Sequence, residues 1–253
     1  GTLDQSLKKQ AELAGVKINY NCEITEAEVD INATGPRKRS NVEGYKYPGV
    51  AKGVVFETNS PDQALLIFND DMAYRGYSYL LIARGHGTLQ SVVLGDLRRV
   101  HYGLELTLDY VENKIGVDIQ NPQAVGGVGN FTMTPEYERQ GALVVGEAAG
   151  LQDILWGFGM RFAFRSGYLA AQSIVHNFDY AKASEKMFSP LIRSSIVNRY
   201  IWEKFISRDY GFMLRNVKLL EKLLYSMHSL NPVQRLLEPL ARRHMSELYP
   251  MTV

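Results

Sequence analysis

One stretch, VVGEAAGLQDILWGFGMRFAFRSG at residues 144–167, restricts the fold of this chain more than any other. An apolar run ends at Gly146, and Glu147 then stands at the expected carboxyl end of a strand, the end at which open α/β sheets bind ligands. Gly157 and Gly159 precede a helical pattern, and the bare N–H groups of a helix start favour anions. The stretch therefore predicts a strand–loop–helix joint. It either binds a hydroxyl-rich, partly anionic ligand or uses small residues only for tight packing.

The residues that follow Gly159 have the pattern of a helix. Small and apolar residues recur there at helical spacing, and we expect this face to pack against a sheet. The predicted face consists of Met160, Ala163, Phe164, Gly167, Ala170, Ala171 and Ile174.

The start of the chain predicts one helix and two strands. Residues 2–15 favour an amphipathic helix. Residues 16–25 predict a strand that buries Cys22, and 28–37 contain a second, short strand that must end in a turn because of its Gly-Pro pair. The buried stripe of the helix is predicted at Leu3, Leu7, Ala11 and Ala14.

The middle of the chain predicts a β region. Residues 50–94 contain four runs rich in β-branched and aromatic residues, which are typical of antiparallel strands. RGHG at 84–87 is typical of a hairpin turn. Residues 98–118 fit a strand or a helix equally well. Residues 122–131 are rich in glycine and predict a loop, whereas 142–150 predict a buried strand that runs into a loop.

The last third of the chain predicts helices. Residues 177–253 contain 12 Lys and Arg against 7 Asp and Glu, accompanied by aromatic residues, and Asn231-Pro232 is a typical helix start. A basic, aromatic helical tail can rest on a membrane surface, line an apolar substrate channel, or remain a packed cap with a solvated basic face. One helix of the tail is expected to bury Leu219, Leu220, Leu223, Leu224 and Met227.

Composition excludes several classes of protein. A net charge of +1 gives no general nucleic-acid footprint, and no run of 18 apolar residues predicts a transmembrane helix. The five histidines lack the spacing of metal ligands, so we expect no metal site. A single cysteine cannot form an internal disulfide, which fits a cytoplasmic protein. The basic tail leaves association with a membrane surface open as an alternative.

The joint at 144–167 resembles the second flavin-contact motif of FAD-dependent oxidoreductases with the aromatic-hydroxylase-like fold, and within them the geranylgeranyl reductase group. INATGPR at 31–37 resembles the Ala-Thr-Gly strand end near the dinucleotide in the same proteins. The resemblance implies FAD as cofactor, with Glu147 on the ribityl chain. It further implies that the following cofactor-binding residues surround the flavin: Ala33, Thr34, Gly35, Gly146, Gly157, Phe158, Gly159 and Met160.

The resemblance also implies an α/β (α+β) architecture. Residues 1–44 and 131–176 would form the remainder of a Rossmann-like FAD-binding domain, 45–130 an inserted antiparallel β substrate domain, and 177–253 a helical region. The family's Gly-x-Gly-x-x-Gly for the pyrophosphate does not occur in the sequence, so we expect an N-terminally truncated chain that holds FAD poorly by itself. The loop proline of the motif is also missing, with Ile154 at about its place.

The resemblance also implies that the β region builds the substrate pocket, and YRGYSYLLIARG at 74–85 resembles the aromatic Gly-Tyr-x-Trp-type strand of the reductase group. Tyr77, Tyr79 and Trp156 are therefore candidates for an aromatic pocket wall, the alternative being ordinary sheet packing. The resulting hypothesis is an FAD-dependent oxidoreductase, reductase- or dehydrogenase-like, for a small apolar substrate of isoprenoid or quinone-like kind. The alternatives are a non-catalytic remnant or binding module without flavin, and a flavin monooxygenase. The sequence names neither a catalytic residue nor the electron donor or acceptor.

Overall fold

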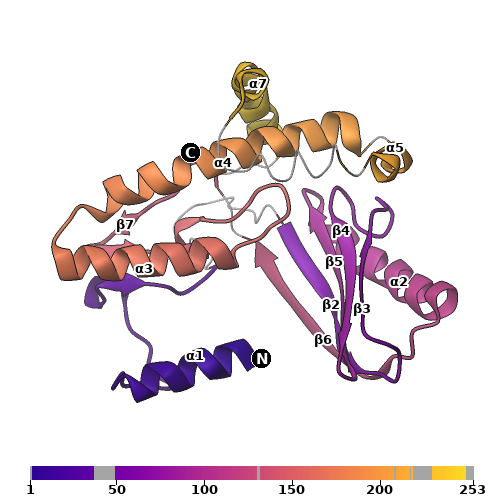
Figure 1. The fold of residues 1–253 in the computed structure, drawn as a ribbon, viewed down its shortest axis with the longest axis horizontal. Helices are drawn as coiled ribbons and strands as arrows, with labels where there is room; N and C mark the ends of the chain where they lie inside the picture. Colours follow the sequence, from indigo (N-terminus) through magenta and orange to yellow (C-terminus); the bar gives the residue numbers. More distant parts are fainter. Residues whose placement is uncertain are drawn as a thin grey trace.

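The computed structural model of the chain describes residues 2–36, 49–129, 132–207, 209–216, 218 and 230–248. It has the mixed α/β fold that the sequence predicts, with helices around two separate sheets (Figure 1). The helices are α1 (Thr2–Leu13), α2 (Val100–Tyr110), α3 (Met160–His176), α4 (Tyr180–Ile201), α5 (Tyr210–Arg215) and α7 (Pro232–Leu248). The strands are β1 (Ile31–Asn32), β2 (Gly49–Glu57), β3 (Gln63–Ile67), β4 (Tyr77–Ala83), β5 (His86–Leu94), β6 (Gln120–Gly129), β7 (Glu138–Arg139) and β8 (Ala142–Val144).

The larger sheet is antiparallel, with the strand order β3-β4-β5-β2-β6. One face is apolar and packs on α2 and on the π-helical turn Val111–Ile115 that continues it. The buried hydroxyls of Ser78 and Thr107 join this face to the helix at 3.0 Å. The opposite face, which we call the open face, is only partly covered and contributes to the site described below.

The β4–β5 hairpin confirms the predicted turn. Its two loop residues, Arg84 and Gly85, both have positive φ angles, of 53° and 77°, as a type I′ turn requires. Ala83 then pairs with His86, and the register continues to Tyr77 and Val92.

The smaller sheet has the order β1-β8-β7. β1 and β8 are parallel, with Asn32 opposite Val144, so their carboxyl ends share one edge of the sheet. The main hydrophobic core lies between this sheet and α3, α4 and α7. The hydroxyl of Tyr180 donates to the carbonyl of Val144 at 2.9 Å and so fixes α4 to the central strand.

The long helix α4 runs above both sheets and carries α7 on its far side (Figure 1). The predicted Asn231-Pro232 start of α7 is confirmed: Asn231 Oδ1 accepts from the N–H of Gln234, and Gln234 Oε1 accepts from the N–H of Asn231. Among the helices of the described residues, none has the length and apolar character needed to cross a bilayer.

Three predictions for local structure are wrong. Residues 120–129 form β6 instead of a loop, because backbone hydrogen bonding to β2 outweighs the low strand propensity of glycine. Residues 16–25 form no strand: no described strand pairs with them, and Tyr20 and Cys22 are exposed. The helix predicted over 2–15 is present, but its apolar stripe is not buried, since Leu3 and Leu7 are 49% and 40% exposed.

The helix α3 is confirmed, but its predicted packing face is mostly wrong. Of that face Ala170 is buried, whereas Met160, Phe164 and Ile174 are exposed. The other buried residues of α3 are Phe162, Ser166 and Ser173. The two serines are compatible with burial because each hydroxyl donates to a carbonyl of the preceding turn. The buried face therefore includes polar residues that a prediction from small and apolar residues left out.

The ambiguous segment 98–118 is helical, since α2 and its π-helical turn occupy most of it. The tail stripe predicted at Leu219, Leu220, Leu223, Leu224 and Met227 lies outside the described residues, as do the predicted domain boundaries at 44/45 and 130/131.

Candidate functional site

A cavity of about 850 Å³, here called the main cavity, lies between the open face of the large sheet and the segment 147–160. Ligand pockets in proteins typically have volumes of about 300–1,000 Å³. Its lining includes seven residues that the sequence predicted as cofactor or substrate contacts. They are Tyr77, Tyr79, Glu147, Trp156, Gly157, Phe158 and Met160.

The predicted aromatic wall is assembled from two distant segments. The hydroxyl of Tyr77 donates to the carbonyl of Trp156 at 2.6 Å, and the two rings meet edge-on with centroids 5.6 Å apart. Tyr79 lies beside Tyr77, with ring centroids 6.2 Å apart. Burial raises the pKa values of both tyrosines, so they stay neutral and present an apolar surface to the cavity.

Three further aromatic residues support this wall from behind. Trp202 contacts Trp156 edge-on at a centroid distance of 4.7 Å, and Phe68 contacts both tryptophans. Tyr210 stacks on Phe68 at 5.7 Å. Trp202 and Tyr210 of the C-terminal region thus help to fix the position of Trp156, whereas Phe205 in the same region is exposed.

The turn that carries Trp156 is organised by Asp153. One carboxylate oxygen accepts from the N–H of Trp156 at 2.9 Å, and the Asp153 carbonyl accepts from the N–H of Gly157 at 2.7 Å. Asp153 is 1% exposed. Burial raises the pKa of this carboxyl, and the hydrogen bond from the Trp156 backbone partly opposes that increase. A polar side chain therefore shapes the cavity wall without reaching the ligand space.

A second anchor is Arg199 of α4, which is 1% exposed. Its guanidinium donates to the carbonyls of Leu155 and Arg75, so it joins the Trp156 turn to the residues that precede β4. Its Nε lies 2.7 Å from Glu203 Oε1, and the other oxygen of Glu203 lies 2.9 Å from His244 Nε2 on α7. This buried chain of charged and polar groups joins the helical region to both sides of the main cavity.

The glycine-rich residues at the start of α3, 157–160, have backbone N–H groups that can donate to a ligand. The N–H of Gly157 is used within the turn, and its carbonyl accepts from Gln152 Nε2 at 2.8 Å. The N–H groups of Phe158, Gly159 and Met160 make no hydrogen bond within the part of the chain that the structure describes. A Cβ built on Gly157 would meet nothing within 4 Å, so this side of the cavity is open to a flat ligand.

Glu147 and Gly146 occupy the short 3₁₀ turn Gly146–Ala149 that follows β8. Glu147 lines the main cavity, whereas Gly146 does not. The N–H of Gly146 donates to the hydroxyl of Ser166 on α3 at 2.8 Å. Gly146 has a φ of 58°, and a Cβ there would lie 3.3 Å from that of Ala163. This glycine therefore allows α3 to approach the strand end closely.

The predicted group Ala33, Thr34 and Gly35 lies outside the main cavity. It follows β1, and so shares the sheet edge from which Glu147 emerges. Asn32 Oδ1 accepts from both the N–H and the hydroxyl of Thr34, which fixes this turn. Gly159 also lies outside the lining, directly before α3.

Sequence reasoning missed Gln152, Asp153 and Arg199 as site residues. The only local signal for Arg199 was Glu203 four residues later, a spacing that pairs charges along a helix. Its contacts to Leu155 and Arg75 join residues far apart in the sequence and left no pattern. Among the described residues of the lining, Glu147 is the one carboxylate, and most of the others are apolar.

No family model and no curated protein matches the chain. Among solved structures, the flavin-dependent brominase Bmp2 aligns at a TM-score of 0.52 with 15% identity, over 79% of this chain and 55% of that one. A geranylgeranyl bacteriochlorophyll reductase-like protein from Thermoplasma acidophilum aligns at a TM-score of 0.49 with 17% identity, over 80% of this chain and 52% of that one. The chain thus spans about half the length of these structures, and it shares its fold with the brominase.

Proposed function

We propose that this chain is the substrate- and ring-binding part of an FAD-dependent oxidoreductase that acts on an apolar, isoprenoid- or quinone-like substrate. One observation carries the proposal. Four residues predicted to contact a flavin, Glu147, Gly157, Phe158 and Met160, line the same cavity as the three predicted substrate contacts, Tyr77, Tyr79 and Trp156. The fold shared with a flavin-dependent brominase supports it.

The residues of the cavity fit a flavin. Phe158, Gly159 and Met160 present N–H groups at the start of α3, where the helix dipole favours the negative charge of a reduced ring. Glu147 would accept a hydrogen bond from a ribityl hydroxyl. The aromatic wall would exclude water and hold the substrate against the ring. The flavin itself would supply the hydride and electron transfer.

We further propose that the adenosine half of FAD is held by polypeptide outside these 253 residues. No Gly-x-Gly-x-x-Gly occurs in the sequence, and no described residue provides an equivalent loop before a helix. In this proposal residues 1–44 and 131–176 complete the FAD-binding domain, 45–130 form the substrate domain and 177–253 the helical region.

A binding module without flavin would keep the same cavity, so the test must measure flavin binding directly. Riboflavin is the sharpest probe, because it has the ring and ribityl chain but neither phosphate nor adenosine. We expect the chain to quench riboflavin fluorescence through the aromatic wall. Glu147→Ala should weaken binding about tenfold, the usual effect of losing a hydrogen bond to a charged group.

Glu138→Ala is the matched control, since Glu138 is an exposed carboxylate on β7 that is absent from the lining of the main cavity. It should leave riboflavin binding unchanged. If wild-type chain does not quench riboflavin at all, the flavin-free binding module becomes the better account. If quenching occurs but Glu147→Ala has no effect, the ribityl role of Glu147 is wrong.

Contact with a membrane surface through the C-terminal helices stays a prediction. α7 presents Val233, Leu236 and Leu240 to solvent, at the spacing of one helical stripe. Arg243 on the same helix is also largely exposed.

A further inference from the structure

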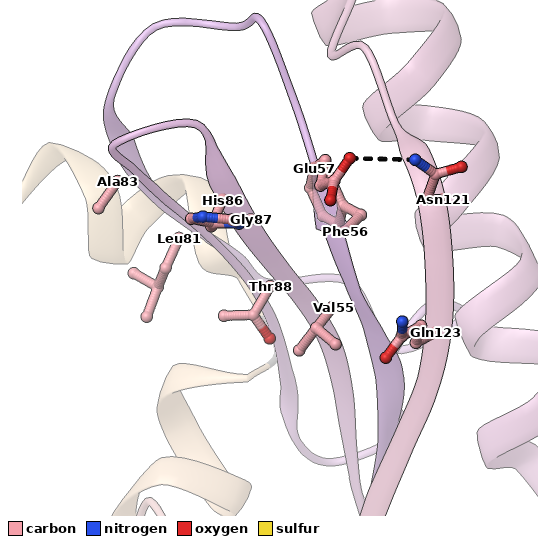
Figure 2. A pocket seen from close by; sticks show the side chains of 10 residues that line it. All are labelled: Val55, Phe56, Glu57, Leu81, Ala83, His86, Gly87, Thr88, Asn121 and Gln123. Atoms are coloured by element: carbon pink, nitrogen blue, oxygen red, sulfur yellow. Dashed lines mark hydrogen bonds between the residues drawn. The ribbon is translucent and has the colours of Figure 1, made fainter. Parts of the chain in front are cut away.

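A second cavity, of about 480 Å³, lies at the hairpin end of the large sheet, and we call it the hairpin cavity (Figure 2). It is lined by Val55, Phe56, Glu57, Leu81, Ala83, His86, Gly87, Thr88, Asn121 and Gln123. These residues come from β2, β4, β5 and β6, and none of them was predicted as a site residue.

The two cavities adjoin on the open face, because Leu81 lines both of them. Directly opposite residues of an antiparallel pair share a face, and Leu81 pairs with Thr88, which pairs in turn with Val55. Figure 2 shows the side chains of this row lying side by side across the strands.

The strand geometry gives the length of the shared groove. Side chains on one face of β4 alternate with a period of two, so Tyr77, Tyr79, Leu81 and Ala83 form one line. Tyr77 stands at the main cavity and Ala83 at the hairpin cavity. Six residues at about 3.3 Å each separate them by roughly 20 Å. The groove floor is therefore long and narrow.

The character of the floor changes along this line. Tyr79, Leu66 and Leu81 make it apolar next to the main cavity. At the hairpin end the lining is still largely apolar, but it includes the polar side chains of Glu57, His86 and Asn121. Such a gradient fits a molecule that is apolar along most of its length and polar at one end.

A β-bulge aims one of these polar side chains. The register between β2 and β6 shifts between Val55 and Glu57, and Asn121 in the bulge has a φ of 49°. Its amide donates to Glu57 Oε2 at 3.0 Å (Figure 2). Bulges commonly redirect a side chain next to a site. Here the bulge places an amide and a carboxylate together at the end of the groove.

We propose that the hairpin cavity is a subsite for the uncharged hydroxyl or amide end of an elongated apolar substrate, whose other end reaches the aromatic wall of the main cavity. Glu57, Asn121 and His86 provide both acceptors and donors for such a group. The carboxylate of Glu57 disfavours an anionic end such as a carboxylate or phosphate. This inference rests on the proposed function, because it assigns a substrate class to that same site.

The test uses straight-chain alcohols as probes, at concentrations below their aggregation threshold. It follows the tryptophan fluorescence of the chain, which comes from Trp156 at the main cavity and from Trp202 packed against it. Tetradecanol should bind at least about tenfold more tightly than octanol, because its additional methylenes lie on the apolar floor. Tetradecanoate should bind more weakly than tetradecanol. Glu57→Gln should narrow that difference by removing the opposing charge.

Gln123→Phe, at an exposed position on the edge strand β6, should fill the hairpin cavity with little risk to the fold and adds no tryptophan to the readout. It should abolish the advantage of tetradecanol and leave octanol binding as in wild type, which also verifies folding. Thr88→Phe is a second blocking variant. Equal affinities for the two alcohols in wild type, or an undiminished advantage in both blocking variants, would overturn the proposal. Neither result depends on riboflavin binding, so failure here is separable from failure of the proposed function.

Discussion

The two walls of the main cavity are built in opposite ways. On one side, the turn Leu151–Trp156 is almost inaccessible: Ile154 is 0% exposed and Asp153 is 1% exposed. On the other side, the open face of the sheet leaves Leu66 63% and Leu81 47% exposed. The first wall is fixed by buried side chains of α4, and the second by the backbone hydrogen bonds of its strands.

This difference separates two tasks. A turn fixed from behind by Arg199 and Asp153 keeps Trp156 and the start of α3 in one position, as the orientation of a reactive ring requires. Side chains on an open sheet face can be substituted without a change in the backbone that carries them. We therefore expect the turn to determine whether the site works, and the sheet to determine which molecule it accepts.

The largest expected effect is on the fixed wall. Arg199→Met leaves the carboxylate of Glu203 buried without its guanidinium partner and removes the donors to Leu155 and Arg75. Breaking a buried ion pair typically lowers the free energy of unfolding by about 3–5 kcal/mol. Urea denaturation followed by tryptophan fluorescence measures the change.

Arg243→Met is the matched control for this variant. Arg243 pairs with Glu247 at 3.0 Å at the same four-residue spacing, but its side chain is 78% exposed. Its removal should change the free energy of unfolding by less than about 0.5 kcal/mol. Similar losses in the two arginine variants would show that the turn is not fixed in the manner described.

A smaller loss of stability is expected for substitutions on the sheet wall. Its size should depend on how close the added side chain lies to the backbone of the neighbouring strand. A Cβ on Gly53 would lie 2.0 Å from the carbonyl oxygen of Leu89 in the adjacent strand, whereas one on Gly127 would meet nothing within 4 Å. Gly53→Ala should therefore lower the free energy of unfolding by about 1–3 kcal/mol, as overpacking does. Gly127→Ala should be neutral or slightly stabilising.

Thermal and urea unfolding of the two alanine variants measure both changes in the free energy of unfolding. If Gly127→Ala were as destabilising as Gly53→Ala, the open face would not tolerate side-chain exchange, and the contrast between the two walls would fail.

The same contrast explains what could be predicted from sequence. Strands β2 to β5 and their hairpin follow from local patterns of β-branched residues and from Arg84-Gly85, and those predictions are confirmed. The aromatic wall was predicted only through a resemblance between motifs. β6 was missed because its stabilisation comes from pairing with β2, about 70 residues earlier in the chain.

The fixed wall could not be predicted for a related reason. Arg199 and Arg75 are 124 residues apart, and neither hydrophobic periodicity nor a motif reports such a contact. The strand predicted over 16–25 is the opposite error, because a strand was predicted where the structure has none. Its residues have strand propensity, but no described strand pairs with them. Long-range partners decided each of these cases, whereas local pattern decided those that were predicted correctly.

The smallest expected effect is a dependence on pH that only the fixed wall should show. Burial raises the pKa of Asp153 above its ordinary value of 3.8, so the folded state favours the neutral carboxyl. Its contribution to stability is complete below the unfolded pKa and is lost as pH rises through the folded pKa, by about 1.4 kcal/mol for each pH unit between the two pKa values.

Asp153→Asn keeps an acceptor for the Trp156 N–H but cannot ionise. The variant should therefore gain stability relative to wild type as pH rises through this window, in urea unfolding measured at a series of pH values. Asp71→Asn, at a 79% exposed side chain, should show no such trend. Parallel pH profiles for wild type and Asp153→Asn would mean that the buried carboxyl does not carry the cost that its position implies.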